Sequence, residues 1–255
     1  MIKNAVEDEV FVPKKWKILF QLLRKKQRRT RLFRSDLFFQ EVMKNSPIPC
    51  RALDTIVAKS SKIGLEDFFS RNGNLSPYEI IAISSIVADR APMRLLEIGT
   101  FDGNTTLQMA LNAPREAIIH TLDLPQGEVE TAQPVLESDY QFIEDAAKEE
   151  RKFLKSSVSH KVQQHFGDST KLDFELFTED GPLDLIFIDG GHSFECVKSD
   201  TEKALKVISE NGVILWHDFT PHFAGVYSFL CELSKTLELV HIAGTNLVLL
   251  DRLTK

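Results

Sequence analysis

The sequence contains few cysteines and no long apolar run. Its cysteines, Cys50, Cys196 and Cys231, are widely spaced along 255 residues, which is typical of neither a disulfide framework nor a cysteine-rich zinc site. No apolar stretch approaches the roughly 18 residues of a membrane-spanning helix, and the N-terminus lacks the short apolar core of a signal peptide. We therefore expect reduced thiols and a soluble, cytoplasmic protein.

Acidic residues are missing from one part of the chain. Residues 10–35 contain ten Lys or Arg and no Asp or Glu, whereas the rest of the chain has 21 basic and 37 acidic residues, a net charge of −16. A strongly acidic body argues against a nucleic-acid-binding face, so no nucleic acid partner is expected.

The basic residues coincide with a helical pattern. Residues 14–44 are predicted to form two helices, because Trp16, Leu19, Phe20 and Leu23 fall on one stripe and a second stripe begins at Phe33, with Leu37 and Val42. The first of these helices, within residues 14–34, carries the basic residues. Such a helix can pack on the acidic body, meet a second subunit in a homo-oligomer, or lie on an anionic membrane as a peripheral contact. We predict a basic helical arm over residues 1–50 and a single catalytic domain over residues 51–255.

The sequence also lacks the Gly-x-Gly-x-x-Gly fingerprint of dinucleotide sites. Residues 95–98 read as a buried parallel strand, and a turn with Gly99 and Gly103 leads into a helix. A turn of this kind at the carboxyl end of a strand is where open α/β sheets bind nucleotides. The carboxylates of Glu97 and Asp102 would repel a diphosphate and suit a ligand that carries an ammonium and a sulfonium.

Other predicted strands also end in polar residues. A strand over residues 117–122 ends at Asp123, where a carboxylate can accept hydrogen bonds from both hydroxyls of a ribose. A strand over residues 161–166 precedes Asp168. The acidic residues between these two strands are expected to form a helix, over about 139–154, with a solvated face.

The strongest chemical pattern follows two later strands. Residues 183–188 form a buried strand that ends at Asp189, and residues 213–216 form the next strand, which ends in His217 and Asp218. Because consecutive parallel strands joined by a helix are usually neighbours, these side chains should converge. Two carboxylates and an imidazole suit a divalent ion such as Mg²⁺.

Two segments resemble a known family. Ile-Asp-Gly-Gly-His-Ser-Phe-Glu over 188–195 and Gly-Val-Ile-Leu-Trp-His-Asp-Phe over 212–219 are similar to methyltransferase family 24 of the class I S-adenosylmethionine (SAM) dependent enzymes. That family is related to the metal-dependent catechol and caffeoyl-CoA O-methyltransferases. The resemblance covers about Leu95 to Asp251. It implies a Rossmann-like α/β fold with a seven-stranded, mostly parallel sheet in the order 3-2-1-4-5-7-6, here with a helical N-terminal extension.

The resemblance also implies roles for individual residues. His192 stands where the related enzymes have a lysine base, and with Asp189 it is the predicted catalytic pair. The predicted metal ligands are Asp189, His217 and Asp218. The predicted cofactor-binding residues are Glu97, Gly99, Thr100, Gly103, Asp123, Asp168 and Asp189.

The expected function is therefore SAM-dependent O-methylation of a small hydroxylated molecule, assisted by Mg²⁺ or another divalent cation. Two alternatives remain open at this point. The chain could be a non-catalytic scaffold that binds SAM, or it could use His192, His217 and Asp218 as a two-histidine, one-carboxylate iron site for oxidation.

Overall fold

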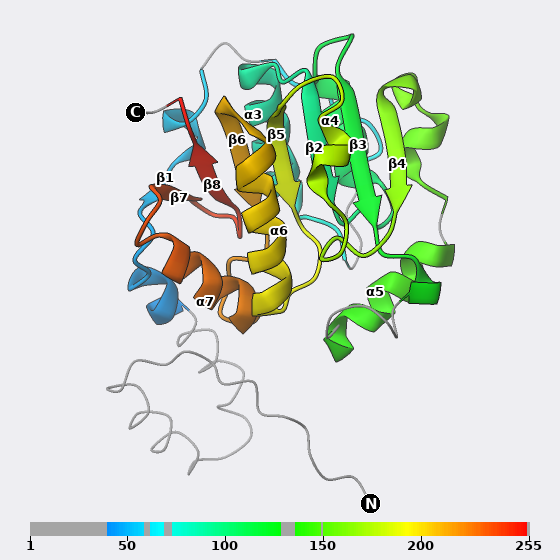
Figure 1. The fold of residues 1–255 in the computed structure, drawn as a ribbon. Helices are drawn as coiled ribbons and strands as arrows, with labels where there is room; N and C mark the ends of the chain where they lie inside the picture. The colour runs from blue at the N-terminus through cyan, green and yellow to red at the C-terminus, as the bar shows by residue number, and fades with distance from the viewer. Residues whose placement is uncertain (1–39, 59–61, 69–72, 129–135, 149, 254–255) are drawn as a thin grey trace, which may run out of the picture.

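The computed structural model describes residues 40–58, 62–68, 73–128, 136–148 and 150–253 (Figure 1). The two helices predicted over residues 14–44 lie outside these ranges except for residues 40–44, which are helical. The described residues include the α-helices α3 (Pro77–Arg90), α4 (Asn104–Asn112), α5 (Glu137–Lys148), α6 (Phe194–Val207) and α7 (Ala224–Leu233). The strands are β1 (Cys50–Arg51), β2 (Arg94–Ile98), β3 (Ile118–Asp123), β4 (Val162–Phe166), β5 (Leu183–Ile188), β6 (Ile208–Trp216), β7 (Leu239–Ile242) and β8 (Val248–Asp251).

The strands form a sheet in the order β1-β7-β8-β6-β5-β2-β3-β4. The predicted order 3-2-1-4-5-7-6 corresponds to β4-β3-β2-β5-β6-β8-β7, so the mostly parallel sheet is confirmed. β8 is antiparallel to both of its neighbours, β6 and β7. The predicted strand count of seven is one too low, because the two-residue strand β1 pairs parallel with β7 at the sheet edge. A segment of two residues carries no periodicity that the sequence could reveal.

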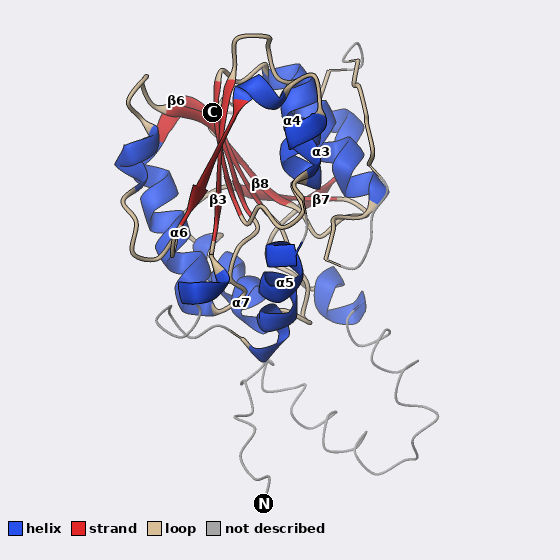
Figure 2. Cartoon of the chain, turned by 90° about the vertical axis from the view of Figure 1, so that its right-hand side faces the viewer, coloured by secondary structure: helices blue, strands red, loops and turns tan. Residues whose placement is uncertain are grey.

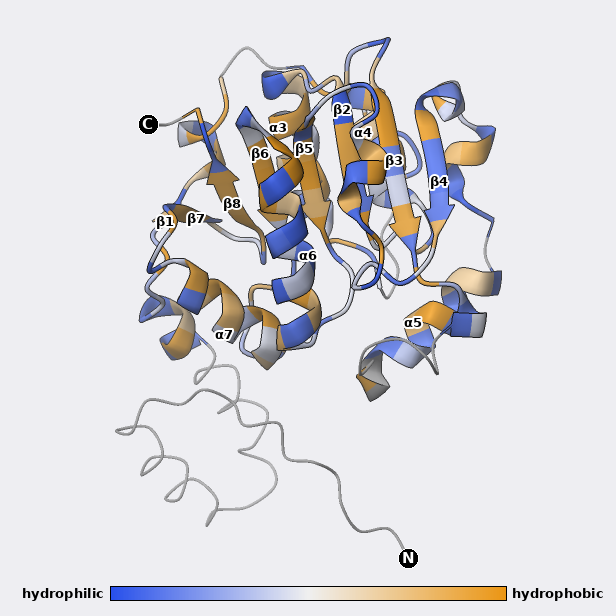
Figure 3. Cartoon of the chain, viewed as in Figure 1, coloured by the Kyte–Doolittle hydropathy of each residue, from blue (hydrophilic) through white to orange (hydrophobic). Residues whose placement is uncertain are grey.

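Helices cover both faces of the sheet (Figure 2). The apolar strands alternate between two cores: Ile186 and Ile188 of β5 pack toward α6 and α7, whereas Leu185 and Phe187 pack toward α3. In Figure 3 the strands β5, β6 and β8 are mostly hydrophobic along their length, whereas α6 shows several polar segments. Burial on both faces is what makes a parallel strand read as a continuous apolar run.

Helix α3 begins with a capping box. The Ser76 hydroxyl accepts from the Glu79 backbone N–H, the Glu79 carboxylate accepts from the Ser76 N–H, and Pro77 is the first helical residue. Ala91 ends the helix in the left-handed conformation, with φ of 47°. The helix therefore starts at a fixed point directly beside the ends of the central strands.

Three further expectations meet the structure here. The strand predicted over residues 213–216 is longer in the structure, because β6 already begins at Ile208. The predicted domain boundary after residue 50 falls within β1 and stays a prediction, although Ile48 is buried in the core. Within the described ranges, none of the helices has the length and apolar character needed to cross a membrane.

Candidate active site

A cavity of about 600 Å³ opens at the carboxyl ends of the central strands. Its volume lies within the range of small-molecule sites, and its position at the strand ends is the usual one for open α/β sheets. Of the residues predicted from the sequence, those that line the cavity are Gly99, Asp123, Asp168, Asp189, His192, His217 and Asp218. Glu97, Thr100 and Gly103 are not part of its described lining.

The glycine turn after β2 brings two strand ends close together. Gly99 has φ of 95°, and a Cβ at this position would lie 2.1 Å from the backbone oxygen of Asp189. Gly103 has φ of 75° and precedes α4, and its missing Cβ leaves room for the Phe153 ring. Between them Phe101 adopts φ of 48°, an uncommon conformation for a bulky residue, and lines the cavity.

Asp123 and Asp168 mark one half of the cavity. Asp123 Oδ2 accepts from an Arg151 guanidinium nitrogen at 3.0 Å. Burial raises the pKa of Asp123 to about 6, and the charge of Arg151 opposes that rise. Asp168 Oδ1 accepts from both the backbone and the hydroxyl of Thr170, which orders the loop after β4. Both carboxylates thus face the cavity from fixed positions.

Glu97 does not line the cavity. Its side chain is fully buried, and its Oε2 accepts from the hydroxyls of Thr106 and Thr121. Burial raises the pKa of Glu97 to about 8, so the carboxyl is largely protonated at neutral pH. Glu97 therefore links β2, α4 and β3 from beneath the turn, and its predicted role in cofactor binding stays a prediction.

The predicted metal ligands converge. The donor atoms of Asp189, His217 and Asp218 lie within 4.8 Å of one another, and His217 Nδ1 is 3.0 Å from Asp189 Oδ1. Burial opposes a charge on His217, but the two carboxylates outweigh that effect and raise the pKa of its imidazole. Asp218 has φ of 58°, a strained conformation that turns its carboxylate toward both histidines.

His192 is held between two carboxylates. Its Nδ1 lies 2.7 Å from Asp139 Oδ1 and its Nε2 lies 2.6 Å from Asp218 Oδ2, while Phe223 stacks on the ring at 4.2 Å. Burial disfavours the imidazolium, but the two hydrogen-bonded carboxylates outweigh it and raise the pKa of His192 to about 10. The imidazole of His192 is therefore mostly protonated at neutral pH.

Two acids of the site escaped the sequence analysis. Glu79 was not among the predicted site residues, yet its Oε1 lies 3.4 Å from His217 Nε2 and accepts from the Asn246 backbone N–H. Asp139 was assigned to a solvated acidic face, yet it is 6% exposed and bonds His192. The capping box was a usable signal for Glu79, whereas no local pattern distinguishes Asp139 from its acidic neighbours.

The side chains that line the cavity fit the divalent cation and the SAM cofactor that the sequence implied. Carboxylate oxygens and an imidazole nitrogen in one partly buried cluster match the preferences of a divalent cation. The cluster contains one histidine, His217, rather than the two of the iron alternative, because His192 bonds Asp139 and Asp218 instead. At the other end of the cavity, Asp123 presents a carboxylate suited to the hydroxyls of a ribose.

Known proteins share this architecture. Residues 96–219 match a family model described as a methyltransferase domain. The crystal structure of the O-methyltransferase TomG from Streptomyces achromogenes, involved in tomaymycin synthesis and in complex with SAM, superposes with a TM-score of 0.51 and 19% identity, over 70% of this chain and 81% of TomG. The SAH-bound methyltransferase PaMTH1 from Podospora anserina is 19% identical, with a TM-score of 0.49 over 87% of this chain and 96% of its own. No curated protein sequence matches this chain significantly.

The strand order, the glycine turn and the cavity at the strand ends define the fold of the class I methyltransferases. The similarity to TomG supports the same fold. Over residues 96–219 the chain is similar to the methyltransferase domain family.

Proposed function

We propose that the protein transfers a methyl group from SAM to a hydroxyl of a small molecule, with a divalent cation at the acceptor end of the cavity. The observation that carries this proposal is the placement of Asp123 and the cluster of Asp189, His217 and Asp218 in one cavity of about 600 Å³. The structural similarity to TomG, an O-methyltransferase whose crystal structure is in complex with SAM, is consistent with it.

The proposal gives each half of the cavity a task. Asp123 would accept hydrogen bonds from the ribose hydroxyls of SAM, and Gly99 and Asp168 line the same cavity. Asp189, His217 and Asp218 would hold the cation. When bound, such an ion lowers the pKa of a coordinated hydroxyl. The chain's own contribution is to orient the acceptor oxygen toward the methyl group and to exclude water.

His192 would receive the acceptor proton. Asp139 and Asp218 both accept from its ring nitrogens, so they stabilise the imidazolium that proton transfer produces. This resembles the way in which a carboxylate supports a catalytic histidine elsewhere, by fixing the ring and favouring its charged form. The raised pKa also means that the ring must lose its own proton before it can act.

Calorimetry with SAM and with its product S-adenosylhomocysteine (SAH) tests this function. We expect both to bind, and we expect Asp123→Ala to weaken binding by more than about tenfold, because hydrogen bonds to a charged group contribute about 1.5–3 kcal/mol. Glu116→Ala, at a side chain that is 79% exposed, is the matched control. A wild-type chain that binds neither compound would exclude the proposal. Binding of SAM without methyl transfer to any hydroxylated compound would favour the scaffold alternative.

The basic segment 14–34 carries a separate proposal. Residues 10–35 contain ten Lys or Arg and no acidic residue, and this positive charge would favour contact with an anionic membrane or with the acidic body of a second copy. Sedimentation of the full chain with and without vesicles of anionic lipid separates these possibilities. A monomer that stays in solution with the vesicles would contradict both.

A further inference from the structure

Helix α5 forms one wall of the cavity, apart from the helices that cover the two faces of the sheet. Figure 1 shows it beyond the carboxyl ends of β3 and β4. Phe142, Ile143 and Ala146 of α5 line the cavity. Phe142 also meets Phe101 of the glycine turn edge to face, with ring centroids 6.2 Å apart. The helix therefore contacts the region between the two halves of the site.

The first turn of α5 is attached to the acceptor half. Asp139 Oδ1 lies 2.7 Å from His192 Nδ1, and Asp139 Oδ2 lies 3.4 Å from the His192 backbone nitrogen. The carboxylate is buried, and both of its oxygens thus face the same residue. This double contact fixes the ring plane of His192 as well as its backbone.

The other end of α5 is attached to the cofactor half. One guanidinium nitrogen of Arg151 donates to the Ala146 carbonyl, and the other donates to Asp123 Oδ2 at 3.0 Å. Arg151 is 9% exposed, so this ion pair is shielded from water and is stronger than a surface pair. A single side chain therefore joins the end of α5 to the carboxylate at the end of β3.

The residues after Arg151 extend this attachment to the glycine turn. The Lys152 backbone N–H donates to the Asp102 carbonyl at 2.9 Å. Phe153 occupies the space left by the missing Cβ of Gly103, where a methyl group would lie 2.6 Å from the ring. A displacement of Arg151 would thus be transmitted to the turn that carries Gly99 and Phe101.

We propose that Asp139 and Arg151 are positioning residues through which α5 couples cofactor binding at Asp123 to the orientation of His192. This inference rests on the proposed function, because it takes SAM or SAH as the ligand of Asp123. Its physical basis is that one helix, fixed at both ends, cannot shift at one half of the site without moving its contact at the other. Neither residue was assigned a role by the sequence pattern.

The test measures SAH affinity by calorimetry in wild type, Asp139→Ala, Arg151→Ala and the double variant. We expect each single variant to weaken SAH binding by roughly fivefold or more, the lower end of typical coupling between sites. We expect the double variant to lose less than the product of the two effects, because both act through α5. The conservative variants Asp139→Asn and Arg151→Lys should recover part of the affinity.

Matched controls and a second measurement keep the test decisive. Glu144→Ala, on the exposed side of α5, and Lys155→Ala, at a side chain that is 77% exposed, should leave SAH affinity unchanged. Amide hydrogen exchange of residues 137–148 should slow on addition of SAH in wild type but not in Arg151→Ala. This readout needs no acceptor and no turnover.

The outcomes separate this inference from the proposed function. Wild-type binding of SAH with an unaffected Asp139→Ala variant, or strictly multiplicative losses in the double variant, would overturn the coupling alone. Tighter binding by Arg151→Ala would also overturn it, since Arg151 would then compete with the ribose for Asp123. A wild-type chain that binds no SAH would overturn both the function and the coupling.

Discussion

His192 Nε2 lies 2.6 Å from Asp218 Oδ2, although the two residues are 26 positions apart and follow different strands. This contact joins the predicted base to a predicted metal ligand. Asp218 thus serves two neighbours at once, since its Oδ1 lies 3.3 Å from His217 Nδ1. A substitution of Asp218 should therefore alter both the cation site and the position of His192.

Asp218→Asn tests the cation site directly. We expect affinity for Mg²⁺ and Mn²⁺ to fall by at least about tenfold, the loss typical even of residues that only support metal ligands. Calorimetric titration of the two ions measures it. Glu210→Gln, an exposed acid on the same strand β6, is the control and should bind both ions as wild type does. Equal affinity of Asp218→Asn and wild type would remove Asp218 from the ligands.

Glu97→Gln tests whether the acid of the glycine turn is structural. Because Glu97 does not line the cavity, we expect SAH affinity to change by less than about threefold. This change in binding free energy is well below the roughly 1.4 kcal/mol of a tenfold change. A tenfold loss would return Glu97 to the cofactor site.

The same variant has a defined pH signature. The pKa of Glu97 is raised from 4.5 to about 8, chiefly by burial, so between these values the folded state binds a proton that the unfolded state has lost. Stability from this group is fully present below pH 4.5 and is lost as pH rises through 8. The free energy of unfolding of wild type, measured in urea, should therefore fall from pH 5 to pH 9 relative to that of Glu97→Gln. Parallel curves for the two proteins would contradict the raised pKa.

Gly99→Ala should destabilise the fold. The left-handed backbone at φ of 95° costs an alanine about 1–2 kcal/mol, and the new Cβ would collide with the Asp189 carbonyl. Gly127→Ala is the control, because no atom lies within 4 Å of its added Cβ and its φ is not positive. Denaturant midpoints of the two variants make the comparison. Equal midpoints would show that the β2 turn and β5 end are less closely packed than the distance of 2.1 Å indicates.

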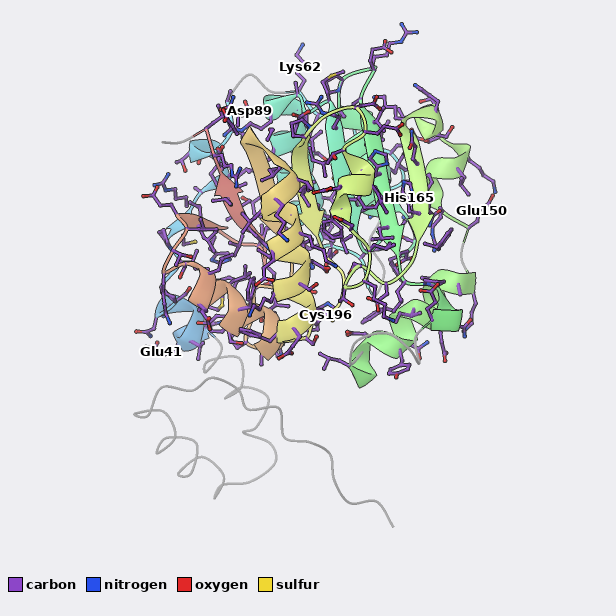
Figure 4. The ribbon with its side chains drawn as sticks, in the orientation of Figure 1. Glu41, Lys62, Asp89, Glu150, His165 and Cys196 are labelled. Atoms are coloured by element: carbon purple, nitrogen blue, oxygen red, sulfur yellow. The ribbon has the colours of Figure 1, made fainter. Side chains whose placement is uncertain are left out.

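His120 and His165, on β3 and β4, should make stability sensitive to mild acid. Their ring nitrogens are 3.1 Å apart beside Phe177, and His165 is labelled in Figure 4. Burial, and then the neighbouring His165, lowers the pKa of His120 from 6.5 to about 4. Between these values the unfolded state binds a proton that the folded state does not, so stability falls as pH drops from 6.5 toward 4.

Removal of the ring should reduce that sensitivity. His120→Gln cannot titrate, so the difference in unfolding free energy between pH 7 and pH 5 should be smaller than in wild type. His222→Gln, at an exposed residue after β6, is the control. An unchanged difference in His120→Gln would contradict the lowered pKa of His120.

The sequence predicted the central sheet well for a specific physical reason. Strands that are buried on both faces, such as residues 183–188, require unbroken apolar side chains, and their ends are marked by glycine and acids. The strand β1 and the early start of β6 at Ile208 were missed, because short or edge pairing depends on a neighbour that is distant in the chain.

By itself, the sequence determined the fold class, the glycine turn and the convergence of Asp189, His217 and Asp218, since strand periodicity and right-handed connections place parallel strand ends together. Only the tertiary structure decided which acids face the cavity. Burial turned Glu97 inward toward two threonines, and the packing of α5 carried Asp139 to His192 and Arg151 to Asp123. Except for Glu97 and Thr106, which are 9 positions apart, these contacts join residues 24 to 53 positions apart, so no local pattern encodes them.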